Sequence, residues 1–245
     1  MDDPAGLEAV ARAVAAEWGL ELGEPFALAR ASYVAPAGPD AVLKVTPPED
    51  DESDEEGDAL ALWDGDGAVR LLRRDPERRT LLLARARPGT DLAKLPEDEA
   101  TAIAAAVGLR VWRPAAEPFR WIGDHIPSWL ESEPSALTPL ALELYGSLDV
   151  GRSTLVHGDF HHQNILSADG RWLAIDPKPM LGEPEYDVPS FLWNPLPCRL
   201  RLEHVESRLA AFAAAGLDEE RMRKWTVIRG AYLQPQDAEA LRTLI

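Results

Sequence analysis

The chain has a single cysteine, Cys198, in 245 residues. One cysteine excludes an intrachain disulfide and a zinc ribbon, and it favours a small packing residue over a nucleophile. Long apolar runs are also lacking, since no stretch approaches the roughly eighteen residues that a membrane-spanning helix requires. The N-terminus has acids where a signal peptide would have basic residues. These absences predict a cytoplasmic protein that has no membrane span.

Basic residues are scarce as well. The chain has 25 Lys and Arg against 42 Asp and Glu, which gives a formal net charge of -17. Nucleic acids are bound by clustered Lys and Arg, so this charge argues against a nucleic-acid partner. An acidic surface would suit a cationic small molecule, but a solubilising surface explains the charge equally well. With 46% hydrophobic residues, the composition is that of a globular chain of one large domain or two lobes.

Strand patterns are concentrated early in the chain and helical patterns late. Apolar and β-branched runs predict strands at 41–45, 69–72, 80–84, 154–157, 165–167 and 171–175. Apolar residues at helical spacing predict helices at 4–18, 96–112, 139–148, 199–215 and 218–232. This order predicts an α+β fold with a small β-rich N-terminal lobe, residues 1–84, and a larger, mainly helical C-terminal lobe, residues 85–245. The turn-rich stretch Arg87–Thr90 belongs to the predicted hinge, about residues 82–90.

Three oxygen-bearing side chains stand at an informative spacing. Asp159 follows a short apolar strand, Asn164 comes five residues later, and Asp176 ends the next strand but one. The turn at 168–170 returns the chain, so that we expect Asp176 to lie beside Asn164. Phosphoryl transfer needs one carboxylate to orient and deprotonate a hydroxyl, and hard oxygen ligands to hold magnesium. The pattern therefore indicates phosphoryl transfer.

Alternatives exist for the same residues. His157, Asp159, His161 and His162 could form a zinc or iron cluster, although nothing else in the chain has ligand spacing. A strand end followed by a charged turn is the purely structural interpretation, and it leaves the Asp-Asn-Asp spacing unexplained.

The segments around these residues resemble a known family. The stretch 155–166, with His157-Gly158-Asp159, and the stretch 172–176 are similar to the His-Gly-Asp motif of the aminoglycoside phosphotransferases, relatives of the protein kinases. The resemblance is strongest to the branch of aminoglycoside 6-phosphotransferases and hydroxyurea kinases, and it rests on 41–45, 67–72, 81–85, 175–179, 185–188 and 191–195. It covers roughly residues 40 to 230. It implies a protein-kinase-like two-lobed fold, with a nucleotide-binding first lobe and a catalytic, substrate-binding second lobe.

The resemblance also implies roles for single residues. Asp159 is expected to be the catalytic base, Asn164 and Asp176 the magnesium ligands, and Lys44 the strand lysine that contacts the α- and β-phosphates. Glu56 is expected to pair with Lys44, because helical spacing places it with Leu60 and Trp63. A capping box from Ser53 to Glu56 is the alternative, in which case Glu52 would serve. For Lys44, a surface lysine is the alternative interpretation.

Further implied positions are less central. The backbone around Leu83 and Arg85 is expected to pair with the adenine edge, and Lys178 to act near the γ-phosphate or to be a solvated loop charge. His157 and Asp187 are expected to support the catalytic loop. The chain departs from the family where it has Ala84 in place of an acid. It also has only Gly38 in 29–39, where a phosphate-covering hairpin belongs, so phosphate contact there would come from backbone amides or from Ser32.

The function that the resemblance implies is a phosphotransferase that uses ATP, or alternatively GTP, with Mg²⁺. The expected acceptor is a hydroxyl of a small cationic molecule, an aminoglycoside such as streptomycin, with antibiotic resistance as the consequence. Glu183, Glu185 and acids of the helical tail are candidates for its pocket, and Trp193 is the tryptophan to test for contact with it. A kinase of hydroxyurea, of an amino alcohol or of a sugar is one alternative, and a non-catalytic pseudokinase is another. No nucleic-acid or membrane partner is expected, and the protein is expected to be a monomer or a homodimer.

Overall fold

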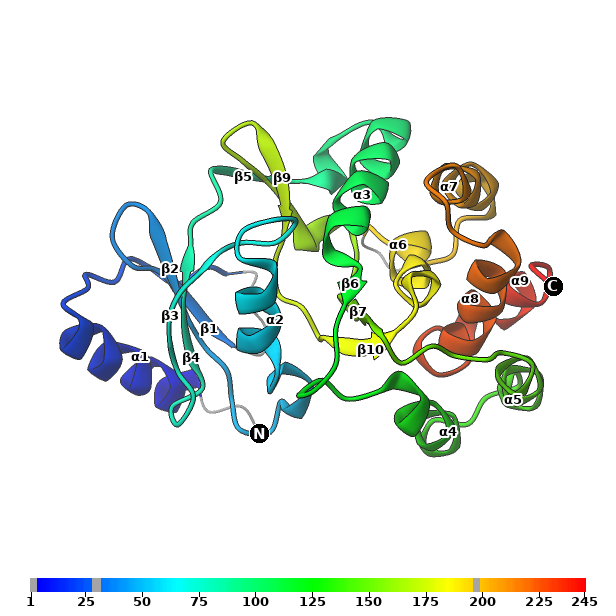
Figure 1. The fold of residues 1–245 in the computed structure, drawn as a ribbon, viewed down its shortest axis with the longest axis horizontal. Helices are drawn as coiled ribbons and strands as arrows, with labels where there is room; N and C mark the ends of the chain where they lie inside the picture. The colour runs from blue at the N-terminus through cyan, green and yellow to red at the C-terminus, as the bar shows by residue number, and fades with distance from the viewer. Residues whose placement is uncertain (1–3, 28–31, 196–198) are drawn as a thin grey trace. The chain divides into compact units, whose positions relative to one another are not determined.

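The structure is a computed structural model that describes residues 4–27, 32–195 and 199–245 (Figure 1). It divides into two compact units. The first contains the described residues up to Thr90 together with Leu166–Ile175, and the second contains Asp91–Ile165 and Asp176–Ile245. The hairpin around residue 170 therefore belongs to the first unit, although it comes late in the chain. Cys198, expected to be a packing residue, lies outside the described residues.

The first unit is built on an antiparallel sheet with the strand order β1-β2-β4-β3. Its strands are β1 (Tyr33–Pro36), β2 (Ala41–Val45), β3 (Leu71–Asp75) and β4 (Thr80–Ala84). The predicted bounds of β2 and β4 are confirmed. β3 begins two residues later than predicted because the N–H of Val69 bonds instead to the carbonyl of Ala174, at 3.0 Å. Val69 thus pairs with a distant part of the chain, which a local pattern cannot indicate.

Two helices cover opposite faces of this sheet, as Figure 1 shows. Side chains alternate along a strand, so Leu43 and Val45 face one side of β2 and Lys44 faces the other. Leu43 and Val45 pack in one core cluster with residues of α1 (Pro4–Trp18), whose bounds match the prediction. Lys44 faces α2 (Glu56–Trp63), which follows a short 3₁₀ turn, η1 (Asp51–Ser53). The alternation thus turns the charged side chain of β2 away from the apolar cluster.

A second, three-stranded sheet has the order β5-β8-β9. Its strands are β5 (Pro88–Asp91), β8 (Ile165–Ala168) and β9 (Arg171–Ala174). The turn between β8 and β9 has positive φ at Asp169 (49°) and Gly170 (76°), as a tight two-residue hairpin requires. The stretch Arg87–Thr90, expected as a hinge, mostly forms β5, and the division between the units follows Thr90.

The second unit is mainly helical and contains a small sheet with the order β10-β7-β6. The sheet strands are β6 (Arg113–Pro114), β7 (Thr154–Val156) and β10 (Met180–Gly182). The helices are α3 (Glu97–Val111), α4 (Ile122–Ser132), α5 (Thr138–Gly146), α6 (Val188–Trp193), α7 (Leu202–Ala214), α8 (Glu219–Leu233) and α9 (Ala238–Arg242). Short 3₁₀ turns lie at η2 (Leu92–Lys94), η3 (His162–Asn164), η4 (Pro184–Tyr186) and η5 (Pro235–Asp237). α4 was not predicted, because Pro127 lies inside it and proline is a helix breaker.

The helix α8 is the central element of the second unit. It contacts α5, α6, α7 and α9, and its residues from Thr226 to Ala231 are all buried. A helix that is buried on every side needs partners for any polar group that it carries. Among the described residues, no helix is long and apolar enough to cross a lipid bilayer.

Candidate active site

In the first unit, Lys44 and Glu56 form a buried ion pair. Lys44 Nζ donates to Glu56 Oε2 at 2.6 Å, and the two side chains are 5% and 1% exposed. The expected pairing is therefore present, and Lys44 is not a surface lysine. Glu56 is the first residue of α2, whereas Glu52 lies in η1 and is exposed. A buried pair of this kind is costly to break from one side, because the remaining charge is left without its counter-ion.

The predicted adenine-pairing positions lie at the end of β4. Leu83 is inside the sheet, opposite Val42 on one side and Leu71 on the other, and its side chain is buried. The N–H of Arg85 donates to the carbonyl of Asp40 at 2.9 Å. A nucleotide edge at Arg85 would therefore meet its carbonyl group and not its N–H.

The expected phosphate-covering hairpin is partly described. Residues before β1 run antiparallel to it, with the N–H of Gly23 bonded to Pro36 O and the N–H of Phe26 bonded to Val34 O, both at 2.8 Å. Ser32 Oγ lies 3.5 Å from Thr46 Oγ1. Residues 28–31 are outside the described part, so the phosphate contacts expected of this segment stay a prediction.

In the second unit, Asp159 and Asn164 are brought together on one loop. The side-chain nitrogen of Asn164, Nδ2, donates to the backbone carbonyl of Asp159 at 3.0 Å and to its Oδ2 at 3.2 Å. Because the amide nitrogen points at Asp159, the amide oxygen of Asn164 is the atom left to bind a cation. The short turn η3 returns the loop over these five residues.

The charge of Asp159 is stabilised by its surroundings. Its Oδ2 lies 3.4 Å from His161 Nε2, and 41% of its side chain is exposed. Desolvation acts to raise the pKa of Asp159, but the His161 contact and nearby positive charges, including that of Arg229, outweigh it and lower the pKa to about 2. The carboxylate is therefore ionised at neutral pH and reachable from solvent.

The backbone before Asp159 is anchored by the buried carboxylate of Asp187. Asp187 Oδ2 accepts from the N–H of His157 and Oδ1 accepts from the N–H of Gly158, both at 2.7 Å. Trp112 Nε1 also donates to Oδ2, at 2.8 Å. His157 is fully buried, and its Nδ1 accepts from the N–H of Asp159 at 3.3 Å. These contacts agree with the supporting roles that the resemblance implies for His157 and Asp187.

Asp176 and Lys178 follow β9. Asp176 is exposed and has a φ of 55°, a left-handed conformation that aspartate adopts more readily than most residues. The backbone N–H of Lys178 donates to the carbonyl of His157 at 2.8 Å, so this segment runs beside the predicted catalytic loop. The convergence of Asp176 with Asn164, and the role of the Lys178 side chain, stay predictions.

The comparison with protein families decides the classification. A model of the family described as aminoglycoside/hydroxyurea antibiotic resistance kinase matches residues 24–132 and 142–234. The chain belongs to this family. It is therefore a phosphotransferase, with the protein-kinase-like α+β fold that the resemblance implied.

Similar proteins are found in the family and beyond it. The kinase is 33% identical over 247 residues to the hydroxyurea phosphotransferase of Kitasatospora aureofaciens, covering 91% of this chain and 71% of that protein. It is 31% identical to the streptomycin 6-kinase of Streptomyces glaucescens, covering 91% and 80%. Among solved structures, a thermostable mutant of aminoglycoside phosphotransferase APH(4)-Ia in complex with ADP and hygromycin B has a TM-score of 0.62. It is 19% identical, and the match covers 96% of both chains.

The kinase has oxygen-bearing side chains of the kind that bind a hard cation. In the part of the chain that the structure describes, no three His, Cys, Asp or Glu side chains are grouped to hold a metal ion. The zinc or iron alternative is therefore wrong for these residues, and His162 instead stacks on Phe191 at 3.9 Å. The amide oxygen of Asn164 and the carboxylate of Asp176 are the kind of ligand that Mg²⁺ prefers, so the residues present fit that ion.

Acids considered for an acceptor pocket have other partners in the kinase. Glu183 is buried, and it accepts from Arg221 Nε at 2.9 Å and from the indole nitrogen of Trp225 at 2.5 Å. Glu185 is also buried and accepts from the N–H of Asp218. Trp193, considered for acceptor contact, is only 4% exposed. These three side chains are buried inside the second unit and are not exposed to a ligand.

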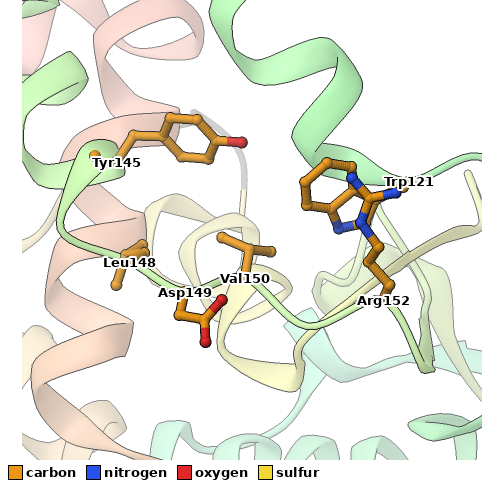
Figure 2. A pocket seen from close by; sticks show the side chains of 7 residues that line it. Trp121, Tyr145, Leu148, Asp149, Val150 and Arg152 are labelled. Carbon is orange, nitrogen blue, oxygen red and sulfur yellow. The ribbon is translucent and has the colours of Figure 1, made fainter.

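Figure 2 shows a hollow in the second unit whose lining includes none of these three residues. It is lined by Trp121, Tyr145, Leu148, Asp149, Val150 and Arg152, and the guanidinium of Arg152 stacks 3.4 Å above the Trp121 ring. Its lining residues precede β7, whereas Asp159 follows β7. The hollow contains none of the residues that the sequence analysis selected.

Sequence reasoning missed three residues around the predicted loop of the kinase. These are Trp112 and Arg229, which bond to Asp187 and to Gly158 respectively, and His161, which contacts Asp159. His161 had been considered only as a metal ligand, although its position two residues after Asp159 was a usable signal. Trp112 and Arg229 had no such signal, because each is more than seventy residues from its partner.

Gly158 gives a direct test of the loop geometry. Its φ is +82°, and a Cβ added there would lie 1.9 Å from the backbone carbonyl oxygen of Lys178. We expect Gly158→Ala to lower the free energy of unfolding by about 3 kcal/mol, the sum of left-handed strain and backbone displacement. Urea unfolding measures this change. Gly170→Ala is the matched control, because Gly170 also has a positive φ, +76°, but has nothing within 4 Å of the added Cβ. Equal effects of the two substitutions would contradict the steric argument.

Proposed function

We propose that this kinase transfers the γ-phosphoryl group of ATP to a hydroxyl of an aminoglycoside of the streptomycin type, with Asp159 as the group that receives the hydroxyl proton. The observation that carries the proposal is the pairing of Asp159 with Asn164 on a loop whose backbone is anchored by Asp187. A fixed, ionised and solvent-accessible carboxylate beside an amide oxygen is the arrangement that phosphoryl transfer needs.

The low pKa of Asp159 indicates how it would act. A carboxylate with a pKa near 2 is a weak base towards an alcohol, so it removes little of the proton early in the reaction. Phosphoryl transfer has a loose transition state, in which positioning of the hydroxyl matters more than its early deprotonation. Asp159 would therefore orient the acceptor by accepting its hydrogen bond, and would take the proton late.

Four residues have proposed roles with the nucleotide and its metal ion. Lys44, held by Glu56, would contact the α- and β-phosphates, and Lys178 would act near the γ-phosphate. Asn164 and Asp176 would hold Mg²⁺, which neutralises charge on the β- and γ-phosphates when it is bound. ATP is the proposed donor, supported by a fold neighbour solved with ADP, and GTP is the alternative. A cytoplasmic location is part of the proposal, since it would supply the nucleotide.

The choice of acceptor rests on two observations. The net charge of -17 favours a cationic acceptor such as streptomycin, because opposite charges raise the local concentration of the ligand. The 33% identity to a hydroxyurea phosphotransferase, against 31% to a streptomycin kinase, supports hydroxyurea as the second candidate.

An acceptor panel tests the proposal. The purified kinase is incubated with Mg²⁺-ATP and streptomycin, hydroxyurea, choline or ribose in turn, and ADP release is followed beside a mixture without acceptor. We expect release that depends on streptomycin, with a phosphorylated product visible by mass spectrometry, and the same series with GTP reports the donor preference. Release with hydroxyurea alone would support the second candidate. Nucleotide binding without release for any acceptor would support the non-catalytic alternative.

A further inference from the structure

The buried guanidinium of Arg229 contacts the predicted catalytic loop from α8. Arg229 is 5% exposed, and its side chain ends against two backbone carbonyl groups. Nη2 donates to the carbonyl of Gly158 at 3.0 Å, and Nη1 donates to the carbonyl of Tyr186 at 2.8 Å. The guanidinium also lies 4.3 Å from the centre of the Tyr186 ring. One side chain thus joins two segments that are distant in sequence.

The two carbonyl groups belong to the peptide bonds that directly precede Asp159 and Asp187. The carbonyl of Gly158 belongs to the peptide group whose nitrogen is that of Asp159, and the carbonyl of Tyr186 belongs to the peptide group that leads into Asp187. Asp187 in turn accepts from the N–H of Gly158. Gly158 is therefore held through its N–H by Asp187 and through its C=O by Arg229. The peptide plane that carries Asp159 has little freedom left to rotate.

The charge of Arg229 needs an explanation. Within the part of the chain that the structure describes, Arg229 makes no ion pair, although burying a cation without a counter-ion in contact is costly. A neutral amide side chain could donate to two carbonyls at lower cost. Desolvation acts to lower the pKa of Arg229, but Tyr186 and Tyr232, followed by the carboxylates of Asp187 and Asp159, outweigh it and raise the pKa. The guanidinium thus contributes a rigid fork of donors to two carbonyl groups and a positive charge near the predicted catalytic loop.

We propose that Arg229 is a positioning residue for phosphoryl transfer, which fixes the Gly158–Asp159 peptide so that the Asp159 carboxylate meets the acceptor hydroxyl. This inference rests on the proposed role of Asp159. Arg229 itself is expected to touch neither nucleotide nor acceptor, because it is only 5% exposed and its terminal nitrogens donate to backbone carbonyls.

Arg208 on α7 provides a matched control. It is 1% exposed, and its Nη1 donates to the carbonyls of Phe191, Leu192 and Asn194 at 2.6 to 2.9 Å. It also pairs with Glu97. Like Arg229, it is a buried arginine that binds backbone carbonyls in the second unit, but its carbonyls lie at the end of α6 and not in the predicted catalytic loop. Substitution of either arginine should lower stability, and only one should alter catalysis.

The experiment compares Arg229→Met, Arg229→Lys and Arg208→Met at a temperature where circular dichroism shows the variants folded. The probes are Mg²⁺-ATP with streptomycin and Mg²⁺-ATP with hydroxyurea. We expect Arg229→Met to lower kcat about 100-fold, the effect of a displacement of about 1 Å at the reacting group, with little change in the KM for ATP. Arg229→Lys should recover part of the loss, because an ammonium group can still donate to one carbonyl. Arg208→Met should lower the melting temperature and leave kcat nearly unchanged.

A second measurement separates positioning from general damage. If Arg229 acts through Asp159, adding Arg229→Met to Asp159→Asn should cause no further loss of the residual rate. A further 100-fold loss in the double variant, or an equal fall of kcat in Arg208→Met, would overturn the positioning role. Unfolding of both Arg229 variants, while Arg208→Met stays folded, would also overturn the positioning role. It would mean that Arg229 is needed for stability. Wild-type turnover in Asp159→Asn alone would instead refute the proposed function.

Discussion

Replacing Asp159 with asparagine is expected to abolish measurable phosphoryl transfer while Mg²⁺-nucleotide binding remains. The substitution keeps the size of the side chain and removes its charge, so the acceptor hydroxyl loses the group that orients it and takes its proton. General-base steps contribute about 10² to 10⁴ in rate, and loss of orientation adds to this. We expect a fall in kcat of at least about 10³ for the accepted substrate. Steady-state ADP release measures the rate, and calorimetric titration with an ATP analogue measures the binding.

The control for this variant is Asp169→Asn. Asp169 lies at the tip of the β8–β9 turn with a φ of 49°, and asparagine adopts that conformation as readily as aspartate. The two substitutions therefore make the same chemical change, one at the predicted site and one in a turn of the first unit. Asp169→Asn should leave kcat and nucleotide binding unchanged. Turnover of Asp159→Asn close to that of Asp169→Asn would remove Asp159 from the mechanism.

Local patterns were enough to predict the bounds of three elements of the first unit. The bounds of α1, β2 and β4 follow from their own periodicity and from the turns beside them. β3 was displaced because Val69 bonds to Ala174, a residue more than a hundred positions away. α4 was missed because Pro127 breaks its pattern. The first error arises where long-range pairing overrides local propensity, and the second where a helix continues through a residue of low helix propensity.

The candidate site likewise contains residues that the sequence predicts and residues that it does not. Asp159, Asn164 and Lys44 could be selected from spacing and from the resemblance, because the chemistry fixes their residue types and their places on strands and loops. Of the groups that hold the loop, only His157 and Asp187 could be selected in this way. Arg229 lies 71 residues from Gly158 and Trp112 lies 75 residues from Asp187, so only the folded chain brings them together. Arg229 also sits in an α8 segment whose mixed charged and apolar residues give no clear face.

Glu183 illustrates a limit of arguing from charge alone. An acidic residue near a predicted active site in a chain of net charge -17 was a reasonable guess for an acceptor ligand. In the structure its carboxylate is bound by Arg221 and Trp225. The sequence gives the number of acids but not which of them already have partners inside the fold. A buried carboxylate with two donors has little capacity left for a cation from solvent.

Lys44→Met is expected to weaken nucleotide binding and to lower kcat by at least about 10², because the ammonium group is the proposed contact of the α- and β-phosphates. It is also expected to lower the free energy of unfolding by about 3 to 5 kcal/mol, since it leaves the Glu56 carboxylate buried without its partner. Calorimetric titration, ADP release and urea unfolding measure the three effects. Arg74→Met is the control, because Arg74 forms an ion pair with Asp58 at 2.6 Å in the same unit, but both side chains are partly exposed. It should change stability little and activity not at all.

The double variant Lys44→Met/Glu56→Leu separates the stabilising role of Lys44 from its role with nucleotide. Replacing both members of a buried ion pair with apolar side chains is often neutral or stabilising, because no charge is then left buried. We therefore expect the double variant to regain most of the stability that Lys44→Met loses, while nucleotide binding and kcat stay low. Recovery of all three would mean that Lys44 only supports the fold of the first unit. A stable unit that no longer binds nucleotide would tie the loss of function to the ammonium group itself.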